Sequence, residues 1–341
     1  MARKPNRKKL NLALQGGGAH GAFTWGALDT ILADERIEIS GISGTSAGAL
    51  NGAATKCGLA RGSRDLARDT LEWLWTQVGA VTDERIAPWL NAVSPQAVSY
   101  AVEMSPGYQM LDNFTRAVSP YATPDFGDAA LRRIVAGLSF EAVCSDRGPI
   151  FTIGATNVRT GKIRLFTRSE INVDSILASA CLPTLFPAVE IDGEHYWDGG
   201  YTGNPALFPL FDMDLPRDIL IVNINPLERP EVPVTARDIQ NRINEISFNT
   251  SLLRELRAIE FVQRLVRGGK VEDGAMKDVL VHMISDDRLM RQLSVATKTV
   301  PNPVVIHQLR EAGAAAAKSF LDRDFESIGE VSTVDLETMF A

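Results

Sequence analysis

The chain has 341 residues and a formal net charge of −7, and hydrophobic and charged residues make up 45% and 23% of it. This composition is typical of a globular protein, and the net negative charge gives a nucleic-acid partner no overall electrostatic support. The three cysteines lie far apart in the sequence without a C-x-x-C pair, so they support neither a zinc site nor a disulfide scaffold.

The N-terminus is basic, and we predict that residues 1–9 form a tail. It holds basic residues and no acidic one: Arg3, Lys4, Arg7, Lys8 and Lys9. Two interpretations stay open, a solvated terminus or a peripheral contact with anionic lipid headgroups, where each basic residue is worth roughly 1 kcal/mol. No apolar run that suits a signal peptide or a bilayer span follows. We therefore expect a cytoplasmic protein, with membrane contact in the second interpretation.

The N-terminal half predicts strands and helices in alternation. The pattern of apolar residues predicts strands over 10–15 and 37–43 and helices over 20–33, 46–58 and 63–78. Residues 79–125 are less regular, because prolines and aromatic residues are scattered through them. This segment is either a cap over a site or an irregular helical connection.

The C-terminal half continues the alternation and ends in a predicted loose tail, residues 327–341. The turn signals Thr160-Gly161 and Asp192-Gly193 mark two hairpins. The expected elements are hairpins over 151–167 and 188–200, helices over 173–182, 236–267 and 305–325, and strands over 218–225 and 278–284. Alternating helices and buried strands predict an α/β fold with a largely parallel sheet covered on both faces. We expect one domain over 10–326, in which 236–326 is a helical extension with one strand.

A glycine cluster follows the first predicted strand and opens the first helix. Gly16, Gly18 and Gly21 match G-x-G-x-x-G, which is the dinucleotide fingerprint. Alternatively, Gly16, Gly17 and Gly18 expose consecutive backbone N–H groups at a helix N-terminus, which suits an oxyanion formed in acyl transfer. The cluster by itself favours neither interpretation.

A G-x-S-x-G motif, residues 44–48, lies between the second predicted strand and the helix after it. This context is typical of a nucleophile elbow. Ser46 would lie on a sharp turn with its hydroxyl at the helix N-terminus, where the helix dipole favours developing negative charge. Gly44 and Gly48 leave room for the tight turn and for close packing. A serine in this place has no role in a nucleotide site, so the motif favours the oxyanion interpretation.

A nucleophilic Ser46 needs a base, and the candidates are His195 and Asp198. Side chains alternate along a strand, so if Asp198 faces the site, His195 faces away from it. Gly199 and Gly200 end the strand in a turn, and a dry site raises the basicity of a carboxylate. We predict a Ser46–Asp198 dyad.

The other histidines have structural interpretations. His282 lies within an apolar strand and is expected to be a core residue. His307 lies in a predicted helix with no evident partner, and His20 is expected to brace the glycine loop by a hydrogen bond.

The ordered blocks GGGAHG, GTSAG and DGG resemble the signature of the patatin-like phospholipases. The stretch ASACLPTLFP before Asp198 and Asn204-Pro205 after it also resemble that family, and the likeness runs from about residue 10 to 210. The resemblance implies a three-layer α/β/α sandwich with a mostly parallel central sheet. It also implies a Ser–Asp dyad that needs no calcium or other cofactor, and lipid or acyl-ester substrates.

Residue by residue, the resemblance makes Ser46 the nucleophile, Asp198 the base and Gly16–Gly18 the oxyanion loop. One departure is His20, where the family usually has arginine or lysine, so the loop brace is expected to depend on pH near 6.5. We predict a serine hydrolase of phospholipids, lysophospholipids or related acyl esters. The alternative is a non-catalytic lipid-binding or regulatory module of the same fold, and the oligomeric state is left open.

Overall fold

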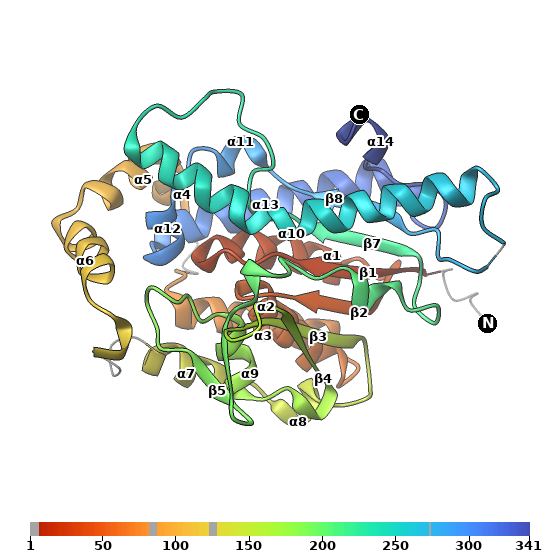
Figure 1. Ribbon diagram of the computed structural model, residues 1–341, viewed down its shortest axis with the longest axis horizontal. Coiled ribbons are helices and arrows are strands. Elements are labelled where there is room, and N and C mark those ends of the chain that lie inside the picture. Colours follow the sequence, from red (N-terminus) through yellow and green to blue (C-terminus); the bar gives the residue numbers. More distant parts are fainter. Residues whose placement is uncertain (1–6, 82–86, 123–127, 273) are drawn as a thin grey trace.

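The computed structural model describes residues 7–81, 87–122, 128–272 and 274–341. Within these residues one sheet of eight strands runs in the order β5-β6-β3-β2-β1-β7-β8, and β4 pairs with β3 (Figure 1). The strands are β1 (Lys8–Leu14), β2 (Ile37–Gly44), β3 (Ile150–Asn157), β4 (Ile163–Thr167), β5 (Val189–Ile191), β6 (Glu194–Asp198), β7 (Asp218–Val222) and β8 (Leu280–Ile284). The pairs from β3 through β2, β1 and β7 to β8 are parallel, and those of β4, β5 and β6 are antiparallel.

Helices cover both faces of the sheet. One face packs against α1 (Ala22–Ala33), α2 (Ala47–Leu59), α3 (Arg64–Val78), α9 (Val173–Ser179) and α13 (Pro303–Asp324). The other face packs against α10 (Ala236–Arg267) and α14 (Leu336–Met339), and Figure 1 shows α10 running along the molecule above the sheet. The three-layer α/β/α fold with a mostly parallel sheet is therefore confirmed.

Strand β7, which lies between β1 and β8, is apolar nearly throughout because both of its faces are covered. Leu220 and Val222 belong to the core beneath α1 and α13, whereas Ile219 and Ile221 belong to the core beneath α10. Successive side chains of a strand point to opposite faces, so a strand covered on both sides needs apolar residues at every position. The run DILIV meets this requirement.

The described part of segment 79–125 is helical. It forms α4 (Ala87–Ala92), α5 (Pro95–Met104), α6 (Pro106–Ala117) and the short 3-10 turn η2 (Pro120–Ala122), and residues 82–86 and 123–127 lie outside the described ranges. Pro95 and Pro106 each occupy the first helical position after a serine, where the missing N–H costs nothing. These prolines therefore begin helices. The cap interpretation stays a prediction.

Both termini are more ordered than the sequence predicted. Strand β1 begins at Lys8, whose ammonium group donates to the carbonyls of Glu326 and Ile328, and Lys9 pairs with Glu38. Arg3 and Lys4 of the predicted basic tail lie outside the described residues. Near the C-terminus, the amides of residues 333 and 334 donate to Val281, and Leu336 is 3% exposed. The segment 327–341 is therefore packed against β8 and not loose.

The remaining elements follow the predicted order with small shifts at their ends. Helix α9 ends at Ser179, before the predicted stop at Pro183. The connecting helices are α7 (Asp128–Ala136), α8 (Phe140–Val143), α11 (Asp287–Met290) and α12 (Val295–Thr299), with 3-10 turns η1 (Gly18–Gly21), η3 (Arg168–Glu170), η4 (Gly199–Tyr201), η5 (Phe208–Phe211) and η6 (Phe325–Ser327). Among the described residues, no helix has the length and apolar character that crossing a membrane requires.

Candidate active site

The glycine cluster leaves the carboxyl end of β1 and enters η1. The amide of Gly16 donates to Asn204 Oδ1 at 2.7 Å, so this N–H group is already occupied. Within the described part of the chain, the amides of Gly17 and Gly18 have no hydrogen-bond acceptor, and both residues line a cavity that also contains Ser46. Two of the three predicted oxyanion donors are thus free, and the third has a structural partner.

Close packing explains why this loop consists of glycines. A Cβ atom at Gly16 would lie 2.7 Å from the Cβ of Ser46. Gly18 has a φ of 58°, and its Cβ would lie 2.3 Å from the carbonyl oxygen of Lys298. Side chains at these positions would displace the loop from the serine beside it.

Ser46 lies on a sharp turn between β2 and α2. Its φ of 55° and ψ of −122° are rare for a residue with a side chain, and Ser46 is only 7% exposed. Its amide donates to Ser179 Oγ at 2.9 Å. The Cβ of a residue at Gly44 would lie 2.6 Å from the carbonyl oxygen of Gly48, and one at Gly48 would lie 2.0 Å from that of Leu14. The local geometry is that of a strand–turn–helix elbow.

Asp198 ends β6 and is 1% exposed. Its Oδ1 accepts from the Gly200 amide at 2.7 Å, and its buried Oδ2 has no hydrogen-bond partner among the described residues. Burial raises the pKa of Asp198 to about 7, while the Gly200 amide and the nearby Ser46 hydroxyl act to lower it. The Ser46 hydroxyl is thus close enough to affect the pKa of the carboxyl group. It does not make a normal hydrogen bond to Asp198, because Oδ2 has no partner within hydrogen-bond distance among the described residues.

The two glycines after Asp198 also occupy crowded positions. The Cβ of a residue at Gly199 would lie 2.2 Å from the carbonyl oxygen of Gly154, and one at Gly200 would lie 2.4 Å from the ring of Phe248. Glycine at these positions lets the backbone turn back over the carboxylate, and it lets α10 approach the turn.

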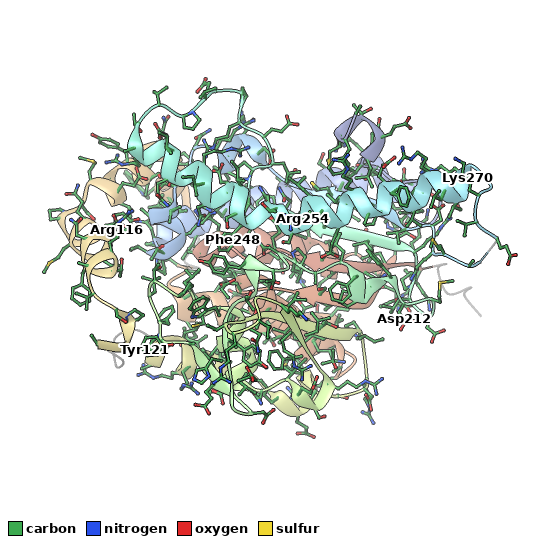
Figure 2. The ribbon with its side chains drawn as sticks, viewed as in Figure 1. Arg116, Tyr121, Asp212, Phe248, Arg254 and Lys270 are labelled. Carbon is green, nitrogen blue, oxygen red and sulfur yellow. The ribbon has the colours of Figure 1, made fainter. Side chains whose placement is uncertain are left out.

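A cavity of about 430 Å³ joins these groups. Ser46, Asp198, Gly17 and Gly18 lie in its wall, and the rest of the wall is mainly apolar, with Leu74, Trp75, Leu131, Ile134, Leu182, Leu185, Phe186 and Phe248 among its side chains. Figure 2 shows Phe248 on α10, near the middle of the molecule. The cavity has the size and character of a site for an apolar chain.

A family model for patatin-like phospholipases matches residues 12–211. The chain belongs to the patatin-like phospholipase family. Membership implies a hydrolase that acts on acyl esters of lipids, and hence a lipid substrate. The structure is also similar to that of VipD from Legionella pneumophila, with 14% identity, a TM-score of 0.43, and 93% of this chain and 67% of the VipD chain covered. No match was found among curated proteins.

Among the residues that the structure describes, no histidine of this patatin-like protein lines the cavity that contains Ser46. The side chain of His195 is 36% exposed and lies 3.8 Å from Glu190, so it does not share the cavity with Asp198. His282 is buried between Asp218 and Thr333, as expected of a core residue.

His20 braces the glycine loop through a hydrogen bond of 2.9 Å with Thr297 Oγ1. Burial, and secondarily the charge of Lys298, lower the pKa of His20 well below 6.5. Both effects favour the neutral imidazole, so any pH dependence of the brace is expected well below pH 6.5. The sequence alone does not reveal that the ring is buried beside a cation.

Several side chains that support the patatin-like site were not predicted. Ser179 accepts from the Ser46 amide and donates to the carbonyl of Gly154. Asn204 was noted only as part of the family resemblance, although it binds the Gly16 amide. Asn225 and Lys298 lie beyond the matched family region, and no motif marks them. Within the described residues, no group of three or more His, Cys, Asp or Glu side chains is placed to hold a metal ion.

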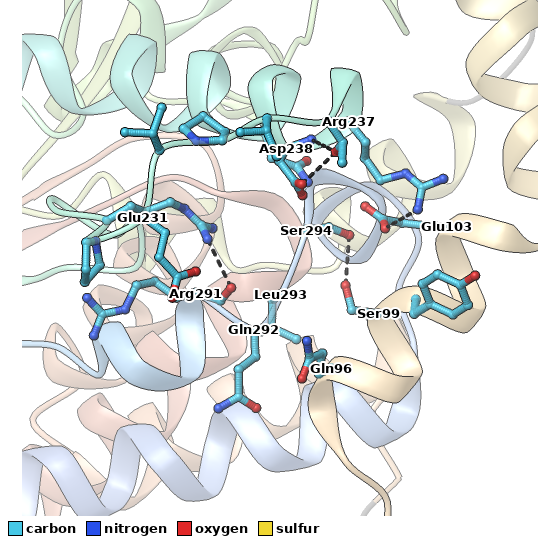
Figure 3. Close-up of a pocket in the computed structure, with 18 residues that line it drawn as sticks. Gln96, Ser99, Glu103, Glu231, Arg237, Asp238, Arg291, Gln292, Leu293 and Ser294 are labelled. Carbon is cyan, nitrogen blue, oxygen red and sulfur yellow. Dashed lines mark hydrogen bonds and ion pairs between the residues drawn. The ribbon is translucent and has the colours of Figure 1, made fainter.

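A larger hollow of about 730 Å³ lies elsewhere, between α5, the start of α10 and residues 291–294. Figure 3 shows that many of its polar groups pair with one another, including Ser99 with Ser294 and Arg237 with Glu103. None of the predicted site residues lines it. The smaller cavity, rather than the larger one, is the candidate active site.

Proposed function

We propose that the chain hydrolyses acyl esters of phospholipids, lysophospholipids or related lipids through an acyl intermediate on Ser46, with Asp198 as the general base. One observation carries this proposal. A buried carboxylate, a strained serine and two unoccupied backbone amides line the same mainly apolar cavity, although the residues are far apart along the chain. This is the set of groups that acyl transfer requires.

In the proposed reaction, Ser46 Oγ attacks the ester carbonyl as its proton passes to Asp198. The carbonyl oxygen becomes an oxyanion that the Gly17 and Gly18 amides stabilise, and the N-terminal end of α2 favours the same negative charge. The intermediate expels the alcohol, which takes the proton from Asp198. Water then attacks the acyl-serine with Asp198 again accepting a proton, and the fatty acid leaves as the serine is restored.

The environment of Asp198 supports its role as a base. Burial raises its pKa to about 7, so the carboxylate is a stronger base than an exposed aspartate and is still largely ionised slightly above neutral pH. The missing hydrogen bond at Oδ2 leaves one acceptor position for the serine proton. A small movement of the Ser46 hydroxyl would complete this contact, since catalytic hydrogen bonds are often long in the free enzyme.

Steady-state hydrolysis of a short-chain p-nitrophenyl ester tests the proposal. Ser46→Ala and Asp198→Asn are expected to abolish turnover with the fold intact by circular dichroism, because each removes a reacting group. His195→Ala is the matched control and is expected to keep full activity, because this side chain is exposed outside the cavity. An inactive His195→Ala with an active Asp198→Asn would assign the base to His195 instead.

The same variants separate catalysis from lipid binding. Mass spectrometry of a mixed lipid extract, before and after incubation with the wild type and with Ser46→Ala, would identify the lipids consumed and the fatty acids released. A wild type that retains lipids but releases no fatty acid would favour the non-catalytic lipid-binding alternative.

A further inference from the structure

The carbonyl group of Gly16 is held from two sides. It accepts from Asn204 Nδ2 at 3.3 Å and from Asn225 Nδ2 at 3.0 Å, while the Gly16 amide donates to Asn204 Oδ1. All of these groups are buried. The peptide group between Gly16 and Gly17 therefore has little freedom to rotate.

The Asn225 amide can take only one of its two orientations. Lys298 Nζ donates to Asn225 Oδ1 at 2.7 Å and to Asn244 Oδ1 at 3.2 Å. An ammonium group has donors and no acceptor, so the atom of Asn225 that faces it must be the oxygen. The Nδ2 group is then directed at the Gly16 carbonyl and at Gln15 Oε1, which lies 3.1 Å away.

This arrangement fixes the direction of a proposed oxyanion donor. In a trans peptide the carbonyl of Gly16 and the N–H of Gly17 point to opposite sides, so holding the carbonyl also directs the amide. Gly17 lines the cavity beside Ser46. We propose that Lys298 is a positioning residue, which orients the Asn225 amide and thereby aims the Gly17 amide at the oxyanion. The inference rests on the proposed function.

Helix α12, which carries Lys298, contacts the glycine loop at two further points. A Cβ at Gly18 would lie 2.3 Å from the carbonyl oxygen of Lys298, and Thr297 forms a hydrogen bond with His20. Helix α12 lies outside the region that the family model matches. The C-terminal part of the chain thus supplies the support for a loop near the N-terminus.

The charge of Lys298 strengthens this support. Burial lowers the pKa of Lys298 to about 8, with Glu245 acting to raise it and Arg229 to lower it. The group is therefore still mainly charged at pH 7, and a charged donor makes a shorter and stronger hydrogen bond than a neutral one. The side chain of Lys298 is only partly buried, because it lines the cavity.

The test compares Lys298→Met, Asn225→Ala and the double variant with the wild type in p-nitrophenyl ester turnover. Each single variant is expected to lower kcat about 10- to 100-fold, which is less than the roughly 100- to 1,000-fold cost of losing an oxyanion donor outright. KM is expected to stay within about twofold, since the oxyanion forms only in the transition state. The double variant should have a kcat close to that of Asn225→Ala, because Lys298 acts through Asn225.

Lys277→Met is the matched control, since Lys277 is also a partly buried lysine, but its ammonium group donates to backbone carbonyls and it does not line the cavity. It should keep the wild-type kcat, and thermal unfolding would verify that every variant is folded. A raised KM with unchanged kcat in Lys298→Met would make Lys298 a substrate-binding residue and overturn the inference, as would losses that multiply in the double variant. Wild-type turnover that does not require Ser46 would instead refute the proposed function.

Discussion

The buried carboxyl group of Asp198 combines a cost to stability with a use in catalysis. The side chain is almost completely enclosed, and only Oδ1 has a hydrogen-bond partner among the described residues. Its ionised form is therefore disfavoured in the folded protein, and the pKa rises to about 7. The proposed reaction needs that ionised form.

The pH dependence of activity follows from this pKa. Below about pH 7 the Asp198 carboxyl is mostly protonated and cannot accept the serine proton. We expect kcat/KM to rise with pH from 5 to 8, with a midpoint near 7, in p-nitrophenyl ester hydrolysis by the wild type. A profile that is flat over this range would exclude Asp198 as the titrating base.

The stability of the protein should vary with pH in the opposite direction. The pKa of Asp198 is about 7 in the folded protein and ordinarily 3.8, so between these pH values the folded state holds a proton that the unfolded state has released. The protonated Asp198 therefore makes its full contribution to the free energy of unfolding below about pH 4, and this contribution is lost as the pH rises through 7. Asp198→Asn avoids this loss and is expected to be more stable than the wild type at pH 8, by roughly 2–4 kcal/mol.

Urea unfolding at pH 5 and pH 8 measures this difference. Asp146→Asn is the control, because its carboxyl is exposed at the surface and should change stability little at either pH. Equal stability of the wild type and Asp198→Asn at pH 8 would contradict the burial argument.

The backbone of Ser46 predicts an unusual response to glycine. A φ of 55° costs a residue with a Cβ about 1–2 kcal/mol and costs glycine almost nothing. Ser46→Gly should therefore melt higher than Ser46→Ala, with both inactive. At Ser99, in the middle of α5, Ser99→Gly should instead melt lower than Ser99→Ala, because glycine is about 1 kcal/mol less favourable than alanine inside a helix. Calorimetry of the glycine and alanine variants at both positions tests these two statements. A melting temperature of Ser46→Gly below that of Ser46→Ala would show that the backbone at Ser46 is not strained.

The residues of the site differ in how far sequence could predict them. The elbow at Ser46 and the turn at Asp198 are local patterns, and the strand alternation separates Asp198 from His195 without a structure. Asn225 and Lys298 act on Gly16 across a separation of about 200 residues or more, so no local pattern contains their role. The hydrogen bond from the Gly16 amide to Asn204 also joins residues far apart in the sequence, so no local pattern predicts it.

At the level of elements, the expected strands and helices correspond closely to those observed, because periodicity reports which faces are buried. The prolines of segment 79–125 make its sequence pattern less regular, whereas in the structure Pro95 and Pro106 begin helices. The C-terminal residues 327–341 are ordered, although the sequence predicts a loose tail. Their order comes from hydrogen bonds to Val281 and from the burial of Leu336, both of which depend on long-range packing.

A glycine contact between α1 and α13 should be sensitive to one added methyl group. A Cβ at Gly313 would lie 1.9 Å from the carbonyl oxygen of Phe23, and a Cβ at Gly26 would lie 1.9 Å from that of Arg310. Gly313→Ala is expected to destabilise the protein by about 1–3 kcal/mol or more, although alanine favours a helix.

Gly107→Ala in α6 is the matched control for this helix contact. A Cβ at Gly107 would have no neighbour within 4 Å, so no loss of stability is expected. Urea unfolding of both variants tests the contact, and equal stability of Gly313→Ala and the wild type would show that the two helices can move apart at little cost.

On the scale of the whole molecule, the family region alone does not contain the complete sheet. The match ends at residue 211, whereas β7 pairs with the central strand β1, and α10 and α13 cover opposite faces. We predict that residues 10–326 fold as one unit, and that a truncated chain of residues 1–211 shows no cooperative thermal transition. Cooperative unfolding of this truncated chain would make the C-terminal part a separate domain.

Membrane contact through the basic N-terminus stays a prediction. Lys8 and Lys9 are engaged with Glu326, Ile328 and Glu38, so the contact would depend on residues 1–7. Figure 1 shows the beginning of β1 on the side of the molecule opposite to α5 and α6.

The most direct test of the account is the site of covalent modification by a fluorophosphonate, which reacts with activated serines. The account predicts one adduct per chain, on Ser46 in peptide mapping by mass spectrometry. The adduct should be absent in Ser46→Ala and should form much more slowly in Asp198→Asn. An adduct on another residue, or equal labelling of the wild type and Asp198→Asn, would contradict the proposed pairing of Ser46 with Asp198.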